Sequence, residues 1–261
     1  MRIEQCYISV PLRKSIFKNI LDYYSLVPYH DKRKPSVFWG FYNSKEDAAA
    51  LKNHKSLAVL VWRGNDVFRS GHMKFVKKKP YIKSVAISSF IEKDLKSKKM
   101  LYKRVPLIGC DMNNIKPCPK GNFIYAYLPA GDKNKSVYGF KMVKKIREKI
   151  GHKIIVVDSP VRHTKKKILE LYRNSFCGFR FTGHDGIANS VIEMGLMGRK
   201  SVYNDLYVPC SIHWSADDLD GILKAIDGEA KTIGQTDYIT ATATKNFINV
   251  GKNWLDTGFW N

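Results

Sequence analysis

Two glycines that bracket a short turn, with a carboxylate after them, form the clearest chemical pattern of the sequence. Gly183 and Gly186 delimit the turn, and Asn189, Ser190 and Glu193 follow in a helix-like segment. Glycine permits a tight strand-to-helix turn and a close approach of the backbone to a ligand. The backbone N–H groups of Asn189 and Ser190, which open the helix, would bind a diphosphate.

Glu193 follows Asn189 by four residues and Ser190 by three, so the three side chains share one helix face. A carboxylate one turn into that helix can accept hydrogen bonds from both hydroxyls of a ribose. The alternative is a glycine-rich turn before an ordinary helix with a solvated Glu193. The ordered series of elements around the motif favours the binding site.

The elements that must position these residues alternate between strands and helices, which is typical of parallel, doubly wound sheets. In the first half the expected strands are 6–10, 36–41, 57–62, 84–87 and 105–108, and the expected helices are 15–24, 45–53 and 89–99. In the second half the expected strands are 122–128, 153–157, 178–181 and 201–204. The expected helices there are 136–150, 165–173, 189–197, 216–226 and the final amphipathic 240–255.

The polar, turn-rich stretch 111–120 is the natural domain boundary. The α/β pattern therefore predicts two Rossmann-like domains, residues 1–115 and 116–239, with parallel sheets that face each other across a cleft. A C-terminal helix within 240–261 is expected to pack back toward the first domain. Ser136, and Asp217 or Ser215, are the expected N-caps of the first and last helices of the second domain.

Over about residues 121–227 the sequence resembles the nucleotide-sugar half of GT-B glycosyltransferases. The resemblance rests on 154–160, on the turn 179–186 and on 191–202. In those enzymes a second carboxylate follows the first after seven intervening positions, as Glu193 follows Asp185 here. This implies that Asp185 with its neighbours, including His184, contacts the sugar of a donor such as a UDP-sugar, and that Glu193 contacts its ribose.

A leaving nucleoside diphosphate needs its negative charge stabilised, and GT-B enzymes usually use basic side chains for this. Lys133 and Lys135 in one loop, and Arg162 and His163 in another, are the candidates, although the family pattern also has an Arg in the first loop. The run 165–167 is interpreted as a solvated helix start. No spacing resembles a metal site, and neither a metal nor a tightly bound cofactor is expected.

Asp66 is the predicted catalytic base, because it follows the apolar strand 57–62, where catalytic groups of doubly wound sheets lie. His72 and Asp111 compete for this role, and closing a turn after Gly64 is the structural alternative for Asp66. The carboxylate spacing is commoner in sugar-retaining enzymes, which strictly require no protein base, so the stereochemistry stays open.

The chain holds 45 Lys and Arg against 23 Asp and Glu, a net charge of +22. Residues 1–120 carry 25 basic and 9 acidic side chains, or +16, and this field favours an acidic partner. Lysine-rich clusters at 32–34, 77–79 and 98–99, with aromatic residues between them, could bind phosphates and stack a base. The candidate acceptor-binding residues of this domain are Arg13, Lys14, Trp39, Tyr42, Trp62, Arg63 and Arg69.

The first acceptor hypothesis is a hydroxymethylated pyrimidine in DNA, because phage enzymes that glycosylate such bases are GT-B proteins with a similar charge. Such a base would have to be exposed or flipped. The second hypothesis is a lipid-linked sugar or glycan at an anionic membrane face. The third is a non-catalytic nucleic-acid-binding module. No obligate protein partner is indicated.

The longest unbroken apolar run, 57–62, is too short to span a bilayer, and the amino terminus lacks a signal-peptide pattern. The five cysteines are odd in number and scattered, which favours reduced thiols. They are Cys6, Cys110, Cys118, Cys177 and Cys210. We therefore expect a soluble cytoplasmic protein, in the host cytoplasm if the source is a virus.

Overall fold

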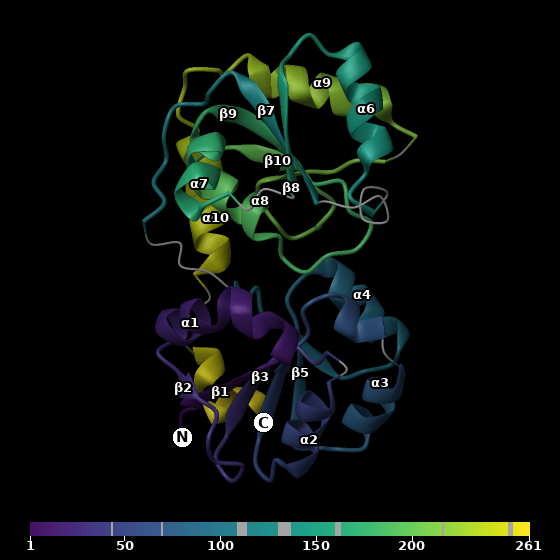
Figure 1. Ribbon diagram of the computed structural model, residues 1–261, viewed down its shortest axis with the longest axis vertical. Coiled ribbons are helices and arrows are strands. Elements are labelled where there is room, and N and C mark those ends of the chain that lie inside the picture. The colour runs from purple at the N-terminus through teal and green to yellow at the C-terminus, as the bar shows by residue number, and fades with distance from the viewer. Residues whose placement is uncertain are drawn as a thin grey trace. The chain divides into compact units, whose positions relative to one another are not determined.

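The computed structural model (Figure 1) describes the 261-residue chain apart from 43, 69, 109–113, 130–136, 160–162, 216 and 250–252. The side chains of 14–19, 70, 72, 129, 158 and 159 also lie outside the description. The chain forms two compact units, each built on its own parallel sheet. Unit 1 comprises Met1–Asp111, His184–Ile187 and Ile248–Asn261; unit 2 comprises Met112–Gly183 and Ala188–Phe247.

Unit 1 contains a six-stranded parallel sheet in the order β2-β1-β3-β4-β5-β6. Its strands are β1 (Gln5–Ile8), β2 (Val27–Pro28), β3 (Ser36–Trp39), β4 (Ala58–Val61), β5 (Ile82–Ala86) and β6 (Tyr102–Arg104). Its helices are α1 (Arg13–Tyr24), α2 (Lys45–Asn53), α3 (Ser70–Lys77) and α4 (Ser89–Ser97). The central strands are buried throughout, as their continuous apolar sequences require.

The expectation of a strand at 105–108 is wrong. The edge strand of this sheet is the more polar β6, which precedes that segment. Its three residues pair with Ser84, Val85 and Ala86, the last three residues of β5. The Val105 N–H donates a hydrogen bond to the Ala86 carbonyl at 3.0 Å. Because Ala86 is the last residue of β5, the pairing with β5 ends there. Backbone partners, and not apolar content, thus decide where this edge strand lies. α3 and the short β2 were not predicted.

Unit 2 contains a five-stranded parallel sheet in the order β11-β10-β9-β7-β8. Its strands are β7 (Phe123–Pro129), β8 (Ile154–Ser159), β9 (Ser175–Phe179), β10 (Lys200–Val202) and β11 (Ser211–Ile212). Its helices are α6 (Phe140–Lys149), α7 (Lys165–Arg173), α8 (Asn189–Leu196), α9 (Leu219–Ala230) and α10 (Tyr238–Ile248).

Alternate residues of β7 face two separate cores in unit 2. Ile124 and Ala126 pack with residues of α6 and α9, whereas Tyr125 packs with Tyr172 of α7 and Met194 of α8. This is the period-2 alternation of a strand that is covered on both faces. α7 and α8 therefore lie on one face of the sheet, and α8 is held there by its own buried residues.

Several helix ends differ from the expected ones for local reasons. α6 begins after Gly139, which has a left-handed φ of 72°, and the expected cap Ser136 lies outside the described residues. Asp218, rather than Asp217 or Ser215, caps α9 by accepting a hydrogen bond from the Gly221 N–H.

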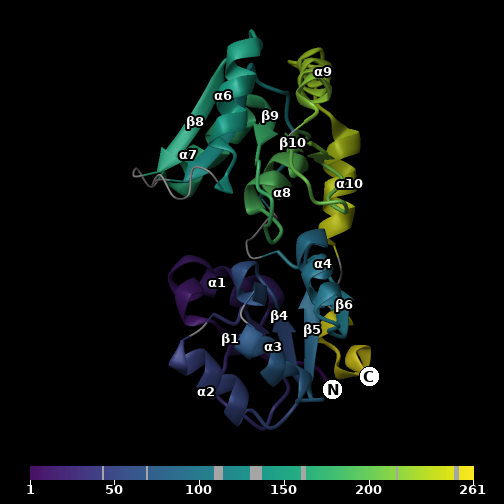
Figure 2. The same ribbon diagram turned by 90° about the vertical axis from the view of Figure 1, so that its right-hand side faces the viewer.

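Within unit 1 the carboxyl-terminal segment of the chain lies beside the amino terminus (Figure 2). The Ile3 N–H donates to the Leu255 carbonyl at 2.6 Å, and Arg2 forms an isolated bridge with Asp256. α10 itself belongs to unit 2 except for its last residue, and the chain packs with unit 1 from Ile248 onward. Among the described residues no helix is long and apolar enough to cross a membrane.

Candidate functional site

The carboxyl ends of β7 and β9 define the first candidate site. The chain enters the sheet of unit 2 at β7, continues to β8 on one side and then crosses to β9 on the other. In open α/β sheets, ligands bind outside the carboxyl ends of the strands at such a switch point. The loop that follows β7 and contains Lys133 and Lys135 lies outside the described residues, whereas most of the segment that leads from β9 to α8 is in view.

The amino end of α8 is available for an anion. Its N-cap residue, Ala188, has no side-chain oxygen. Among the described residues, no group accepts a hydrogen bond from the N–H of Asn189 or Ser190. The buried Asn189 Oδ1 has no partner there either. Unpaired first-turn N–H groups, together with the positive end of the helix dipole, favour a bound negative charge.

Glu193 lies one turn into α8 and is only 2% exposed, so it is not a solvated helix residue. Its Oε1 forms an ion pair with Nζ of Lys165, the first residue of α7. Tyr125 and Tyr172 lie close by. Burial chiefly, and the Glu193 charge to a lesser extent, raises the pKa of Tyr125 to about 12 and also raises the pKa of Tyr172.

Lys165 was expected to be a solvated helix residue, and its pairing with Glu193 is a correction. Thr164 caps α7 by accepting a hydrogen bond from the Lys167 N–H, which fixes Lys165 in the first turn. A buried carboxylate is unfavourable unless a positive or hydrogen-bonding partner lies beside it. Because the Lys165 side chain is 54% exposed, it can move away and leave the carboxylate to other donors.

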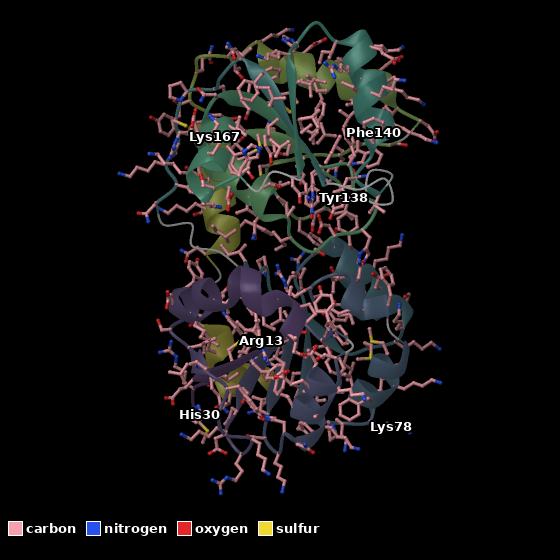
Figure 3. All side chains as sticks on the ribbon, in the orientation of Figure 1. Arg13, His30, Lys78, Tyr138, Phe140 and Lys167 are labelled. Atoms are coloured by element: carbon pink, nitrogen blue, oxygen red, sulfur yellow. The ribbon has the colours of Figure 1, made fainter. Side chains whose placement is uncertain are left out.

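Arg180 is a further cation at this edge that sequence reasoning did not assign. It directly follows β9, and its guanidinium lies over the rings of Tyr127, at 5.2 Å, and Tyr138, at 4.5 Å. Tyr138 is labelled in Figure 3. Arg180 and Glu193 act electrostatically on the same two tyrosines, Tyr125 and Tyr172. The expected strand 178–181 contained Arg180, whereas β9 ends at Phe179, so the sequence did not place Arg180 beyond the strand. A basic residue near the carboxyl end of that expected strand was the available signal.

The turn before α8 packs with unit 1. His184 Nε2 lies 2.6 Å from Asp94 Oδ2, and its ring centroid is 4.5 Å from that of Phe68. The Ser88 hydroxyl donates to the Asp185 carbonyl at 2.9 Å. By these contacts Asp185 belongs to unit 1, whereas Glu193 belongs to unit 2.

The two glycines of this turn should respond differently to alanine. A Cβ at Gly186 would lie 2.8 Å from the Arg63 carbonyl oxygen and 3.1 Å from Ile87 Cδ1, whereas one at Gly183 would have no atom within 4 Å. We expect Gly186→Ala to lower the free energy of unfolding by about 1–3 kcal/mol. Gly183→Ala should change it by less than about 1 kcal/mol. Urea denaturation checks both values, and equal effects would contradict this packing.

In unit 1 the predicted base Asp66 is a structural residue. Its side chain is 0% exposed. Its Oδ1 accepts hydrogen bonds from the N–H of Arg63 (3.0 Å) and Gly64 (2.9 Å), and its Oδ2 accepts one from Phe41 (3.0 Å). Burial raises the pKa of Asp66, although these hydrogen bonds act in the opposite direction. The carboxylate joins the loops after β3 and β4 by these hydrogen bonds and has no exposed surface.

A second buried carboxylate, Asp47, was missed. It accepts hydrogen bonds from the Tyr7 hydroxyl (3.0 Å) and the Ser9 hydroxyl (2.5 Å), and the Ser9 oxygen in turn accepts one from the Tyr42 N–H (3.3 Å). Its position at the start of α2, after the N-cap Ser44, was the available signal. These hydrogen bonds hold together the loops after β1 and β3, the two strands between which the strand order of unit 1 reverses.

Three predicted acceptor residues remain at the carboxyl edge of the sheet in unit 1. Arg13 Nε donates to the Ile8 carbonyl at 3.0 Å, and Arg13 also forms an ion pair with Glu46. Tyr42 follows β3, and Arg63 follows β4 with its guanidinium 5.4 Å from the centre of the Trp39 ring. Arg13 is labelled in Figure 3.

The prediction that Trp39 and Trp62 bind the acceptor is corrected, because both side chains are 0% exposed and cannot stack on an acceptor. Both belong to the core of a sheet whose central strands have no exposed face. His163 is exposed. Some predictions fall outside the described residues or side chains, namely those on Arg69, Lys133, Lys135, Arg162 and Asp111, and on the side chains of Lys14 and His72.

The three lysine clusters lie at the opposite, amino-terminal edge of the sheet in unit 1. Residues 32–34 precede β3, 77–79 precede β5, and 98–99 precede β6. Since all strands are parallel, these clusters share one edge. Within the described part of the chain, no three His, Cys, Asp or Glu side chains gather as metal ligands would.

Comparison with known proteins identifies the fold. The chain has the GT-B fold, with two parallel α/β units like those of solved GT-B glycosyltransferases. TarM superimposes with a TM-score of 0.57 at 9% identity, over 86% of this chain and 54% of TarM. The pneumococcal O-GlcNAc transferase GtfA gives 0.54 at 9% identity, over 83% and 54%.

Sucrose-phosphate synthase from Thermosynechococcus elongatus gives a TM-score of 0.58 at 10% identity, over 91% of this chain and 76% of that one. The chain thus spans about half the length of the TarM and GtfA chains, since the match covers 54% of each of them. No protein-family model and no curated protein sequence matches it.

Proposed function

We propose that the protein is a glycosyltransferase that moves a sugar from a nucleotide-sugar donor to a hydroxyl group of an acceptor. The observation that carries this proposal is Glu193. It is a buried carboxylate one turn into a helix whose opening N–H groups, at Asn189 and Ser190, have no described partner. The helix follows the switch point of a parallel sheet, where ligands of this fold class bind.

The proposed donor is a nucleoside diphosphate sugar, with a UDP-sugar first. The GtfA structure is a complex with UDP and GlcNAc, and one TarM structure contains UDP. In our proposal the ribose hydroxyls replace Lys165 as partners of Glu193. The diphosphate would accept hydrogen bonds from the N–H groups of Asn189 and Ser190, with Arg180 as a nearby cation. The other proposed donor contacts are Lys133, Lys135, Arg162, His163 and the turn residues Gly183, His184, Asp185 and Gly186.

In the transfer step the bond between the anomeric carbon and the diphosphate oxygen breaks. The acceptor oxygen then bonds to that carbon, and the acceptor hydroxyl loses its proton. Asp66 is buried and fully engaged, so the proton needs another acceptor. The leaving diphosphate oxygen, which gains negative charge as the bond breaks, is chemically able to take it. Positive groups around the diphosphate stabilise that charge.

For the acceptor we propose an acidic molecule, with a hydroxymethylated pyrimidine of DNA first. The support is the charge of +16 on the first 120 residues, together with Arg13, Tyr42 and Arg63 at the carboxyl edge of unit 1. The lysine clusters at the other edge of the sheet would add only non-specific attraction.

Purified protein incubated with a panel of radiolabelled nucleotide sugars, hydroxymethylated DNA and membrane lipid extract tests the function directly. Label in the DNA fraction supports the proposed acceptor, and label in the lipid fraction replaces it with a lipid-linked one. Label in neither fraction, with no nucleotide sugar consumed, would leave only the non-catalytic binding module.

DNA as a partner also predicts a salt response. Binding of unmodified duplex DNA should weaken at least about tenfold between roughly 50 and 200 mM salt, because Lys and Arg contacts release counterions. Fluorescence anisotropy of a labelled duplex measures this. An affinity that does not change with salt contradicts a phosphate-backbone partner.

A further inference from the structure

A pocket of about 610 Å³ lies entirely within unit 1, at the amino ends of β5 and β6. Its wall includes Ser84 of β5 and Tyr102 of β6. The end of α3, the residues 99–101 that precede β6, and Trp260 and Asn261 complete it. Its volume is that of a small-ligand site. It lies at the opposite edge of the sheet from Arg13, Tyr42 and Arg63, so it is not the proposed acceptor site.

Five lysines line this pocket, and no acidic side chain is among the described residues of its wall. They are Lys77, Lys79, Lys83, Lys99 and Lys103. No ion pair joins any of them to a described acidic residue. Positive charges gathered in a concave site repel one another and attract an anion. Lys78, labelled in Figure 3, directly follows α3 and stands between Lys77 and Lys79 in the sequence.

The inner wall of the pocket is apolar. Val76, Ile82 and Met100 are buried to 3%, 7% and 7% exposure, and the rings of Tyr102 and Trp260 are also part of the wall. A rim of ammonium groups around an apolar wall fits a ligand that has an anionic end and an apolar end. Free inorganic ions would use only the rim.

Ser84 gives a second, independent indication of a ligand. It is 3% exposed, and its hydroxyl has no hydrogen-bond partner among the described residues. A buried hydroxyl without a partner is unfavourable and is rare in folded proteins. An oxygen acceptor bound in the pocket would satisfy it.

Leu101, on the same rim, is 93% exposed between Lys99 and Lys103. Lys103 itself is ordered by contact with the Phe259 ring, whose centre is 4.5 Å from Nζ. The rim thus combines an exposed apolar side chain with fixed positive charge.

We propose that this pocket is a second binding site, for a phosphate-bearing ligand with an apolar group. The phosphate oxygens accept hydrogen bonds from the lysine ammonium groups, and a different oxygen of the ligand accepts one from the Ser84 hydroxyl, which faces the opposite side of β5 from Lys83. The apolar group packs against Val76, Ile82 and Met100. A phospholipid and a free phosphorylated metabolite share this chemistry. The site is independent of Glu193, because all its residues belong to unit 1.

Calorimetric titration of the full chain with monomeric dihexanoyl phosphatidic acid tests the proposal. We expect saturable binding at one site, weakened about tenfold by Lys83→Met, because a charge-assisted hydrogen bond is lost. Ser84→Ala should also weaken binding, while the Tm of the free protein stays equal or rises because an unpaired buried hydroxyl is removed. The matched control, Lys52→Met, changes an exposed lysine of the same unit outside the pocket.

Glycerol 3-phosphate and phosphatidic acid vesicles, titrated in parallel, identify the source. Stronger binding of the monomeric lipid than of glycerol 3-phosphate supports the apolar part of the ligand, and the reverse order overturns it. Binding of the vesicles as well identifies a membrane phospholipid as the source, whereas binding of the monomeric lipid alone identifies a free phosphorylated molecule. Absence of saturable binding by either small ligand, or equal weakening by Lys52→Met, overturns the proposal. Nucleotide-sugar binding should be unchanged in Lys83→Met, so failure here is separate from failure of the donor site.

Discussion

Replacing Glu193 with alanine is expected to raise the KM for the nucleotide sugar about a hundredfold. The carboxylate accepts two ribose hydroxyls in the proposed complex, and losing both hydrogen bonds costs about 3 kcal/mol of binding. Because the ribose is remote from the reacting carbon, its contacts stabilise the bound donor and the transition state alike. The effect should therefore appear mainly in KM, and less in kcat, in steady-state kinetics.

Glu170→Ala is the matched control, since Glu170 lies on α7 and is 53% exposed. It should leave KM unchanged. Because Glu193 is buried and paired with Lys165, its loss could also alter folding, so circular dichroism and Tm accompany the kinetics. Glu193→Gln, which keeps the shape and one accepting oxygen, should give an intermediate KM. A folded Glu193→Ala variant with an unchanged KM removes this residue from the donor site.

Asp66→Ala is expected to lower the free energy of unfolding by about 3–4 kcal/mol, among the largest effects for one residue. Its carboxylate accepts hydrogen bonds from the N–H groups of Phe41, Arg63 and Gly64 inside the protein. Alanine would leave these donors buried without partners and open a small cavity. Urea denaturation, with the slope checked for two-state behaviour, measures the change.

Asp22 offers a control in the same unit, because it is exposed on α1. Asp22→Ala should change stability by no more than about 0.5 kcal/mol. A catalytic Asp66 predicts another pattern, in which Asp66→Ala keeps its stability and loses its activity. That pattern would contradict the structural role assigned here.

The sequence predicts best what local signals determine. α2 and α7 begin and end at the expected residues. Their beginnings are fixed by Ser44 and Thr164, whose side-chain oxygens accept a hydrogen bond from the N–H three residues later. The alternation of strands and helices likewise predicts both parallel sheets. The position of Glu193 within α8 follows from the glycine turn and the helix period.

Long-range contacts were not predictable in this way. A strand buried on both faces is apolar throughout, so its sequence does not tell a core Trp39 from a ligand-facing one. The pairing of Lys165 with Glu193 and that of His184 with Asp94 join residues far apart in the chain. Asp66 has the sequence position of a catalytic residue, and only its burial reveals its structural role.

The edge of the lysine clusters, in contrast, could have been deduced. Each cluster precedes a strand, and in a parallel sheet every strand begins at the same edge. The clusters therefore had to lie away from the carboxyl ends, where the proposed chemistry takes place. Composition suggested one cationic acceptor surface, whereas strand direction assigns the clustered charge to the opposite edge.

A crystal structure of the protein soaked with UDP tests the donor site most directly. We predict both ribose hydroxyls within hydrogen-bond distance of the Glu193 carboxylate, and the diphosphate against the N–H groups of Asn189 and Ser190. Lys165 should then have left Glu193. UDP bound elsewhere, with the pair of Lys165 and Glu193 intact, would contradict the account.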